Sequence, residues 1–120
     1  MKITYDGIEL DCHKKYPTLT PKQKDAICNG CGPAGWKMGI FLNNIYGLSI
    51  KEICNIHDVD FHTYTSSKGF NIANDRLHDN LTAYCNAKSA NWFMRFLRGR
   101  RIKKMVFFVE SPLGWAAFNA

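Results

Sequence analysis

The sequence predicts a single all-α domain of 120 residues. Apolar residues recur at steps of three and four along three long segments, which is the spacing of amphipathic helices. The first two of these segments are joined by a short polar turn, and helices joined in this way pack antiparallel. We therefore expect two long antiparallel helices, a glycine-rich loop before the first of them, and a third, C-terminal helix.

The first twenty residues are interpreted as an N-terminal extension. Residues 1–10 alternate weakly between apolar and polar side chains around Asp6-Gly7. This pattern is compatible with a small hairpin, but two short strands alone are marginally stable, so the hairpin receives little weight. Thr20 followed by Pro21 is a good helix start, and a short helix is expected over 21–28.

The glycine-rich segment spans residues 29–36, with the sequence NGCGPAGW. Three glycines, a proline and an asparagine so close together predict a loop and exclude regular structure. Glycine tolerates dihedral angles that allow several carbonyl groups to face one centre. Residues 37–48 are expected to form a connecting loop over the core.

The central helix is expected over residues 49–64. Ser49 is the predicted N-cap, and Glu52, three residues later, would complete a capping box. His57 lies on the apolar face, and Asp58 lies about 100° further round the helix. The predicted inward face consists of Ile50, Ile53, Cys54, His57, Phe61 and Tyr64.

The other two long helices follow after a turn at residues 65–69. The second is expected over 70–85, with an inward face of Phe70, Ala73, Asn74, Leu77, Leu81 and Tyr84. The third is expected over 91–110, and its apolar residues, Trp92, Phe93, Phe96, Leu97, Ile102, Met105, Val106 and Val109, are predicted to be core. The apolar tail at 115–118 is expected to dock on the domain.

The charge and composition favour anionic partners. The formal net charge is +6, and Arg95, Arg98, Arg100, Arg101, Lys103 and Lys104 form a basic cluster in the third helix. This cluster is either a solvated helix face or a contact for an anionic phospholipid membrane. Nucleic acid is not expected as a partner, because the sequence contains no known nucleic-acid-binding motif.

The N-terminal sequence lacks the apolar region of a secretory signal, and no stretch approaches the roughly 18 apolar residues of a membrane span. The chain is expected to be cytoplasmic as synthesised, or to be virion-associated or released by lysis.

The cysteines allow a metal-site hypothesis. The chain has five cysteines, an odd number, which excludes a complete set of disulfides within a monomer. Cys28-x-x-Cys31 and Cys54-x-x-His57 together have spacings that zinc accepts in a Cys3His site. One alternative is therefore a zinc-stabilised structural or interaction protein without catalytic activity.

Two motifs carry a resemblance to a known family. Gly30-Cys31-Gly32-Pro33-Ala34-Gly35 is followed by Cys54-Asn55-Ile56-His57-Asp58, and an antiparallel helix is predicted next. This arrangement resembles the phospholipase A2 superfamily. The wider sequence, over roughly residues 28–118, looks like small phage- and prophage-encoded phospholipase A2-like proteins.

The resemblance implies a calcium-dependent hydrolase that cleaves the sn-2 acyl ester of glycerophospholipids. His57 would be the general base that activates water, and the backbone N–H of Gly32 would help to hold the oxyanion. Calcium would bind the Asp58 carboxylate and the carbonyl oxygens of Gly30, Gly32 and Ala34. The resemblance further implies a disulfide between Cys31 and Cys54. Trp36, Phe41 and Trp115 are candidates for the rim of a lipid channel.

The chain departs from the family pattern at two positions. The aspartate that supports the catalytic histidine is replaced by Asn74, while Asp75 lies about 100° away from the inward face. The tyrosine that supports this aspartate is Phe61 here, and Tyr64, one turn later, could substitute for it. Because asparagine has no charge to stabilise imidazolium, these changes lead to a further alternative, a catalytically weakened phospholipase fold that binds membranes.

Overall fold

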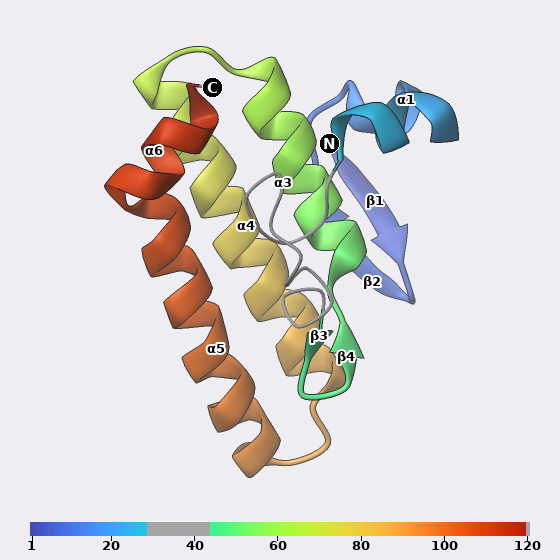
Figure 1. Cartoon of the computed structure of the whole chain (residues 1–120). Coiled ribbons are helices and arrows are strands. Elements are labelled where there is room, and N and C mark those ends of the chain that lie inside the picture. Colours follow the sequence, from blue (N-terminus) through green and yellow to red (C-terminus); the bar gives the residue numbers. More distant parts are fainter. Residues whose placement is uncertain (29–43, 120) are drawn as a thin grey trace.

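The computed structural model describes residues 1–28 and 44–119. Its framework consists of three long helices: α3 (Lys51–Thr63), α4 (Ser67–Lys88) and α5 (Trp92–Glu110). Helix α4 packs against α3 on one side and against α5 on the other (Figure 1). Two short α-helices, α1 (Pro21–Ile27) and α6 (Pro112–Phe118), and one 3-10 turn at Tyr16–Thr18 complete the helical part that the structure describes.

The all-α prediction is wrong, because the described residues also contain two small antiparallel sheets. Strands β1 (Lys2–Tyr5) and β2 (Ile8–Asp11) form one hairpin, and β3 (Asn44–Ile45) and β4 (Leu48–Ser49) form the other. Both turns have a residue pair with positive φ, Asp6-Gly7 and Tyr46-Gly47. Such turns match the natural twist of paired strands, and glycine adopts this conformation without strain.

The N-terminal hairpin is part of the domain and not an extension. Leu10 is fully buried, and the backbone of Asp11 exchanges two hydrogen bonds with the Asn80 amide on α4 (2.9 and 2.8 Å). The Tyr84 hydroxyl donates to Asp6 at 3.1 Å. Two isolated strands would be marginal, but these contacts with α4 supply the missing stabilisation. Pattern analysis of residues 1–10 alone gives no sign of these distant partners.

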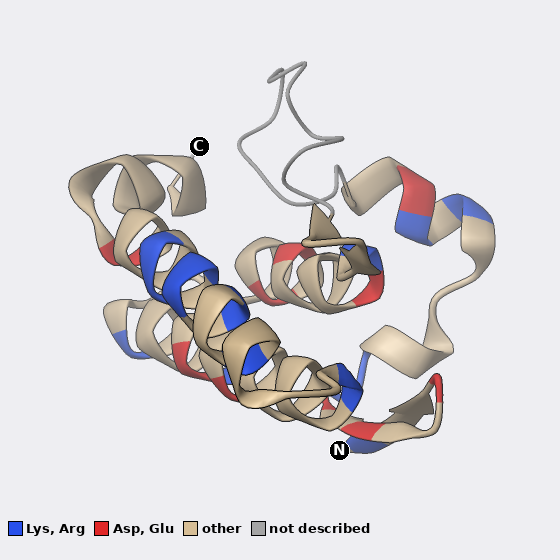
Figure 2. Ribbon diagram, turned by 90° about the horizontal axis from the view of Figure 1, so that it is seen from below, with Lys and Arg blue, Asp and Glu red and all other residues tan. Residues whose placement is uncertain are grey.

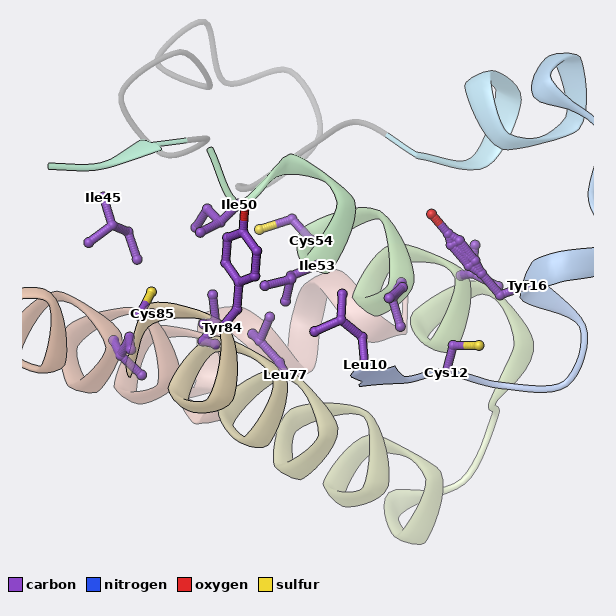
Figure 3. Packing of buried hydrophobic residues seen from close by; sticks show 14 residues of the cluster. Leu10, Cys12, Tyr16, Ile45, Ile50, Ile53, Cys54, Leu77, Tyr84 and Cys85 are labelled. Carbon is purple, nitrogen blue, oxygen red and sulfur yellow. The ribbon is translucent and has the colours of Figure 1, made fainter. Parts of the chain in front are cut away.

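The core lies between α3, α4 and the N-terminal segment. Figure 3 shows Ile50 and Ile53 of α3 facing Leu77 and Tyr84 of α4, with Leu10 closing the cluster. The predicted inward face of α3 is buried from Ile50 to His57, whereas Phe61 and Tyr64 are only half-buried. The buried face is wider than predicted and also includes Ile56, Val59 and Asp60.

The start of α3 differs from the prediction. Ser49 belongs to β4, and the N-cap is Ile50, which provides no side-chain cap. Glu52 does not form a capping box but accepts a hydrogen bond from the Tyr16 hydroxyl. At α1 the prediction is confirmed, since Thr20 and Gln23 form a reciprocal capping box and Pro21 occupies the first turn.

Helix α4 is longer than predicted and extends from Ser67 to Lys88, with Ser66 as its N-cap. The tail forms a separate helix, α6, which begins after the N-cap Ser111. Its Phe118 is buried, so the tail docks as expected.

Helix α5 presents only part of its predicted face to the core. Ile102 is buried, and Met105, Val106 and Val109 pack against the core as predicted. Trp92, Phe93 and Phe96 are not core residues but are 76%, 52% and 55% exposed. Helix α5 packs on α4 and α6, and these contacts need only one inward stripe, which contains Ile102. Arg98, assigned to the basic surface cluster, is buried and donates to the carbonyl groups of two residues in the β3–β4 hairpin, Ile45 and Tyr46.

Candidate functional site

The candidate site is centred on His57, which faces α4 from the middle of α3. The His57 side chain is buried, and its Nε2 atom lies 2.9 Å from Oδ1 of Asn74. Asn74 is 1% exposed, whereas Asp75 on the same helix is exposed. The structure therefore brings Asn74, and not Asp75, to the imidazole.

A second hydrogen bond fixes the orientation of the Asn74 amide. Its Nδ2 atom donates to the backbone carbonyl oxygen of Val109 on α5, at 3.2 Å. A carbonyl oxygen only accepts, so the amide nitrogen must face Val109 and the amide oxygen must face His57. Nε2 of His57 then carries the hydrogen in this bond. Nδ1 of the neutral ring keeps its lone pair, which is the form that a general base requires.

Burial holds the imidazole neutral. It lowers the pKa of His57 to about 4, and the hydrogen bond with Asn74 opposes this shift only in part. At neutral pH the ring is therefore available to take a proton. Asn74 has no charge, so it orients the ring without stabilising an imidazolium ion.

Aromatic side chains connect His57 to the molecular surface. The Phe61 ring lies 4.1 Å from the imidazole, between ring centroids, and contacts Phe70 and Phe118 at 5.8 and 5.1 Å. Trp115 packs on Phe70 and is 42% exposed. This predicted rim residue thus belongs to an aromatic cluster that extends to the histidine.

Tyr64 does not take the place of the missing tyrosine in the contacts that the structure describes. Its ring packs edge-on against His13, with 5.5 Å between the centroids. Tyr64 also lines an open hollow of about 280 Å³ together with Phe61 and Phe118. The hollow lies beside the aromatic cluster and gives this end of α3 access to solvent.

The residue that precedes the glycine-rich segment lies against α3. Cys28 donates from its thiol to the backbone carbonyl oxygen of Asn55, at 3.5 Å. Burial, followed by the negative charges of Asp58 and Glu52, raises the pKa of the Cys28 thiol to about 11. The chain therefore enters residues 29–43 close to the Asp58 carboxylate.

The oxygen atoms at this point suit a hard cation. Asp58 is partly exposed, and one turn earlier the buried Oδ1 atom of Asn55 has no hydrogen-bond partner among the residues that the structure describes. Calcium prefers carboxylate, amide and carbonyl oxygens. Five of the predicted site residues, together with the cysteine predicted to pair with Cys54, lie outside the described residues: Gly30, Gly32, Ala34, Trp36, Phe41 and Cys31.

The disulfide at one of the described cysteines argues against the zinc hypothesis. Cys54 is disulfide-bonded, whereas Cys12, Cys28 and Cys85 are free. Within residues 1–28 and 44–119 no group of three or more His, Cys, Asp or Glu side chains is arranged to hold a metal ion. A disulfide-bonded Cys54 cannot supply the thiolate that the Cys3His site requires.

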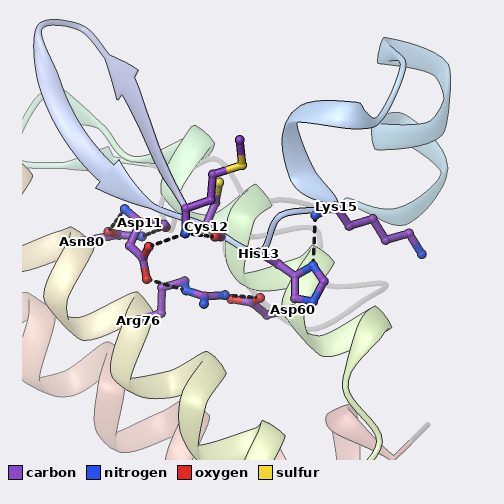
Figure 4. Close-up of polar contacts among 8 residues, drawn as sticks. Asp11, Cys12, His13, Lys15, Asp60, Arg76 and Asn80 are labelled. Carbon is purple, nitrogen blue, oxygen red and sulfur yellow. Dashed lines mark hydrogen bonds and ion pairs between the residues drawn. The ribbon is translucent and has the colours of Figure 1, made fainter.

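Sequence analysis missed a buried ion pair between α3 and α4, one turn after His57. Asp60 is fully buried and its Oδ1 lies 2.5 Å from Nη1 of Arg76, whose Nε binds Asp11 at 3.0 Å (Figure 4). Burial raises the pKa of Asp60 to about 6 against the opposing effect of Arg76. The only sequence signal was an acidic residue at the core-facing helical phase of α3. Val109 was also missed as a residue of the site, because it contributes its backbone carbonyl oxygen, which does not depend on residue type.

Comparisons of the chain with family models, with curated proteins and with solved structures found no match.

Proposed function

We propose that this chain is a phospholipase A2-like ester hydrolase in which His57 is the general base. One observation carries the proposal: the hydrogen-bonded series from His57 to Asn74 to Val109, which holds the buried imidazole with Nδ1 unprotonated. The aromatic cluster around Phe61 offers an apolar environment suited to acyl chains.

In the proposed reaction, Nδ1 of His57 takes a proton from a water molecule as its oxygen attacks the sn-2 ester carbonyl. The bond between the carbonyl carbon and the glycerol oxygen then breaks, and the proton passes from His57 to that oxygen. The products are a fatty acid and a lysophospholipid. Throughout, Nε2 of His57 keeps its hydrogen and donates it to Oδ1 of Asn74, which holds the ring in place.

The proposed cofactor is calcium, held by the Asp58 carboxylate and by the carbonyl oxygens of Gly30, Gly32 and Ala34. When bound, it would contribute positive charge that polarises the ester carbonyl, and the N–H of Gly32 would donate to the same oxygen. The disulfide at Cys54 favours this oxygen-ligand set over the zinc alternative.

A second candidate is a catalytically weakened fold that binds membranes without hydrolysing lipid. The neutral Asn74 beside His57 favours it, because the imidazolium formed during proton transfer gains no charge stabilisation. The two candidates differ only in turnover, so activity decides between them.

The test is fatty-acid release from phospholipid vesicles labelled at the sn-2 chain, with and without calcium. The proposal predicts calcium-dependent release that falls to background in His57→Gln and Asp58→Asn. Lys68→Gln, an exposed change on α4, should leave the rate unchanged. Binding to vesicles with no release in any condition supports the weakened fold, and release that persists in His57→Gln contradicts the role of the histidine.

A further inference from the structure

The outer face of α5 combines exposed aromatic rings with exposed cations. Trp92, Phe93, Phe96 and Phe107 are 76%, 52%, 55% and 78% exposed. At 100° per residue they fall within a stripe about 120° wide, and the same stripe holds three exposed cations. We call this stripe the α5 outer face; it consists of Trp92, Phe93, Phe96, Arg100, Lys103, Lys104 and Phe107, and the exposed Glu110 lies at its C-terminal end.

The inward side of α5 is fully used by the fold, so the outer face is not needed for packing. Ile102 is buried in the core, and Arg98 is buried by its bonds to the β3–β4 hairpin. Figure 2 shows Lys and Arg side by side along α5 and a single acidic position near its C-terminal end. That residue is Glu110, the only acid within α5.

We propose that the α5 outer face docks on the surface of an anionic phospholipid bilayer. Lysine and arginine gain attraction from the negative surface potential of such a bilayer, and aromatic rings are favoured at its headgroup level. The guanidinium of Arg100 lies 5.9 Å from the centre of the Phe96 ring, so the two kinds of group share one surface. A helix lying in the plane of the interface can place all seven side chains at the same depth.

Charge and shape favour a bilayer over other partners. A second copy packed on the same face would bring like charges together, because the stripe holds cations and no acid before Glu110. Proteins that bind single-stranded nucleic acid use a positively charged groove, whereas the rings here are spread over about 22 Å of one convex helix surface. No helix in the described part of the chain is both long and apolar enough to span a membrane, and surface docking requires no span.

The inference deepens the proposed function, since it names the surface through which the hydrolase would reach its substrate. Binding can nevertheless be measured without catalysis. Vesicles of ether-linked phospholipid contain no sn-2 ester, and chelation of calcium removes the proposed cofactor. The test of membrane docking can therefore fail while the test of hydrolysis succeeds, and the reverse.

The experiment measures co-sedimentation with ether-lipid vesicles of phosphatidylcholine alone or mixed with phosphatidylglycerol, in chelator. We expect binding to the mixed vesicles only, weakened at least about tenfold by Lys103→Glu/Lys104→Glu. The matched control is Lys14→Glu/Lys22→Glu, which makes the same charge change at exposed positions outside α5 and should weaken binding much less. Phe96→Ala/Phe107→Ala should weaken binding with no change in net charge. All these residues are exposed, so the melting temperatures should stay close to that of the wild type.

Equal loss in both charge variants would overturn the proposal, because binding would then follow net charge and not this face. A dimer in sedimentation velocity that Phe96→Ala/Phe107→Ala dissociates would assign the face to a second copy. Tighter binding to single-stranded RNA than to mixed vesicles, lost in the same variants, would assign it to nucleic acid. Each of these results contradicts membrane docking, whatever the outcome of the hydrolysis assay.

Discussion

At the scale of single residues, Asn74 decides what the His57 imidazole can do. It is an amide between a ring nitrogen and a backbone carbonyl; the contact with the ring is buried and the contact with the carbonyl is partly buried. In catalytic triads, replacing the aspartate by asparagine is severely damaging because the amide favours the wrong tautomer. Here the Val109 carbonyl prevents that outcome, since it accepts from the amide nitrogen and leaves the oxygen for His57. Asn74 therefore orients the imidazole of His57 but supplies no negative charge to stabilise the imidazolium ion.

The buried position of Asn74 leads to a stability prediction. Asn74→Ala removes one hydrogen-bond partner from His57 and one from Val109, and should lower the free energy of unfolding by about 1–3 kcal/mol. Asp75→Ala, at the next position but exposed, should change it by less than about 0.5 kcal/mol. Urea unfolding of the two variants measures both values. Equal losses of unfolding free energy in the two variants would contradict the two hydrogen bonds assigned to Asn74.

At the scale of elements, the junction of α5 and α6 supports the site. Val109 lies in the last turn of α5, where carbonyl groups lack partners within the helix, so its oxygen is available to Asn74. Helix α6 approaches this turn closely at Gly114. A Cβ atom at Gly114 would lie 1.9 Å from the Val109 carbonyl oxygen. Glycine is therefore required at this position by the backbone of the neighbouring turn.

Gly114 and Gly99 form a matched pair for testing this junction. Gly114→Ala should displace Val109, lower the free energy of unfolding by about 1–3 kcal/mol, and disturb the bond between Asn74 and Val109. Gly99 lies within α5, and a Cβ there meets no atom within 4 Å. Gly99→Ala should therefore stabilise the protein by about 0.5–1 kcal/mol. Thermal unfolding, with NMR of the Asn74 side-chain amide, measures both effects; a neutral Gly114→Ala would contradict the close approach.

At the scale of the whole molecule, two buried groups give opposite pH dependences. The pKa of His57 is lowered from 6.5 to about 4, so its contribution to stability is complete above 6.5 and is lost as pH falls towards 4. The pKa of Asp60 is raised from 3.8 to about 6, so its contribution is complete below 3.8 and is lost as pH rises through 6. Between pH 4 and 6 the two groups change the free energy of unfolding in opposite directions. Each contributes a slope of at most about 1.4 kcal/mol per pH unit.

Substitution of His57 or of Asp60 should separate their two effects on the pH dependence of the free energy of unfolding. The free energy of unfolding of the wild type should change little between pH 4 and 6. In His57→Gln it should fall as pH rises through this window, because the Asp60 contribution is no longer opposed by that of His57. In Asp60→Asn it should rise instead. Urea titrations at several pH values measure the three slopes, and parallel profiles would contradict the assignment of the shifts to these two groups.

The sequence predicted the helical part of the fold better than the small sheets. The apolar periodicity of residues 50–57 and the cap at Thr20 are local signals, and both agree with the structure. The N-terminal hairpin depends on Asn80 and Tyr84, which lie far along the chain, and no local pattern reveals such partners. The aromatic residues of α5 were misplaced because hydrophobicity alone does not tell a core stripe from an exposed one.

The candidate site was predictable to the extent that it follows helical phase. Helical phase agrees with the family pattern in placing Asn74, and not Asp75, on the inward face of the helix, and the structure brings Asn74 to His57. The Val109 carbonyl could not be predicted, because a backbone acceptor leaves no trace in residue type. The exposed stripe of α5 likewise emerges only once Arg98 is seen to be buried and the aromatic rings to be outside.

The measurement that tests the central claim most directly is the rate of sn-2 fatty-acid release by Asn74→Asp compared with the wild type. The claim is that Asn74 positions His57 as the base but lacks the charge to stabilise imidazolium. A carboxylate at this position should therefore raise the rate by about tenfold or more. Asp75→Asn should leave it unchanged, because Asp75 is exposed. A slower or equal rate in Asn74→Asp, in a variant shown to be folded, would contradict the account.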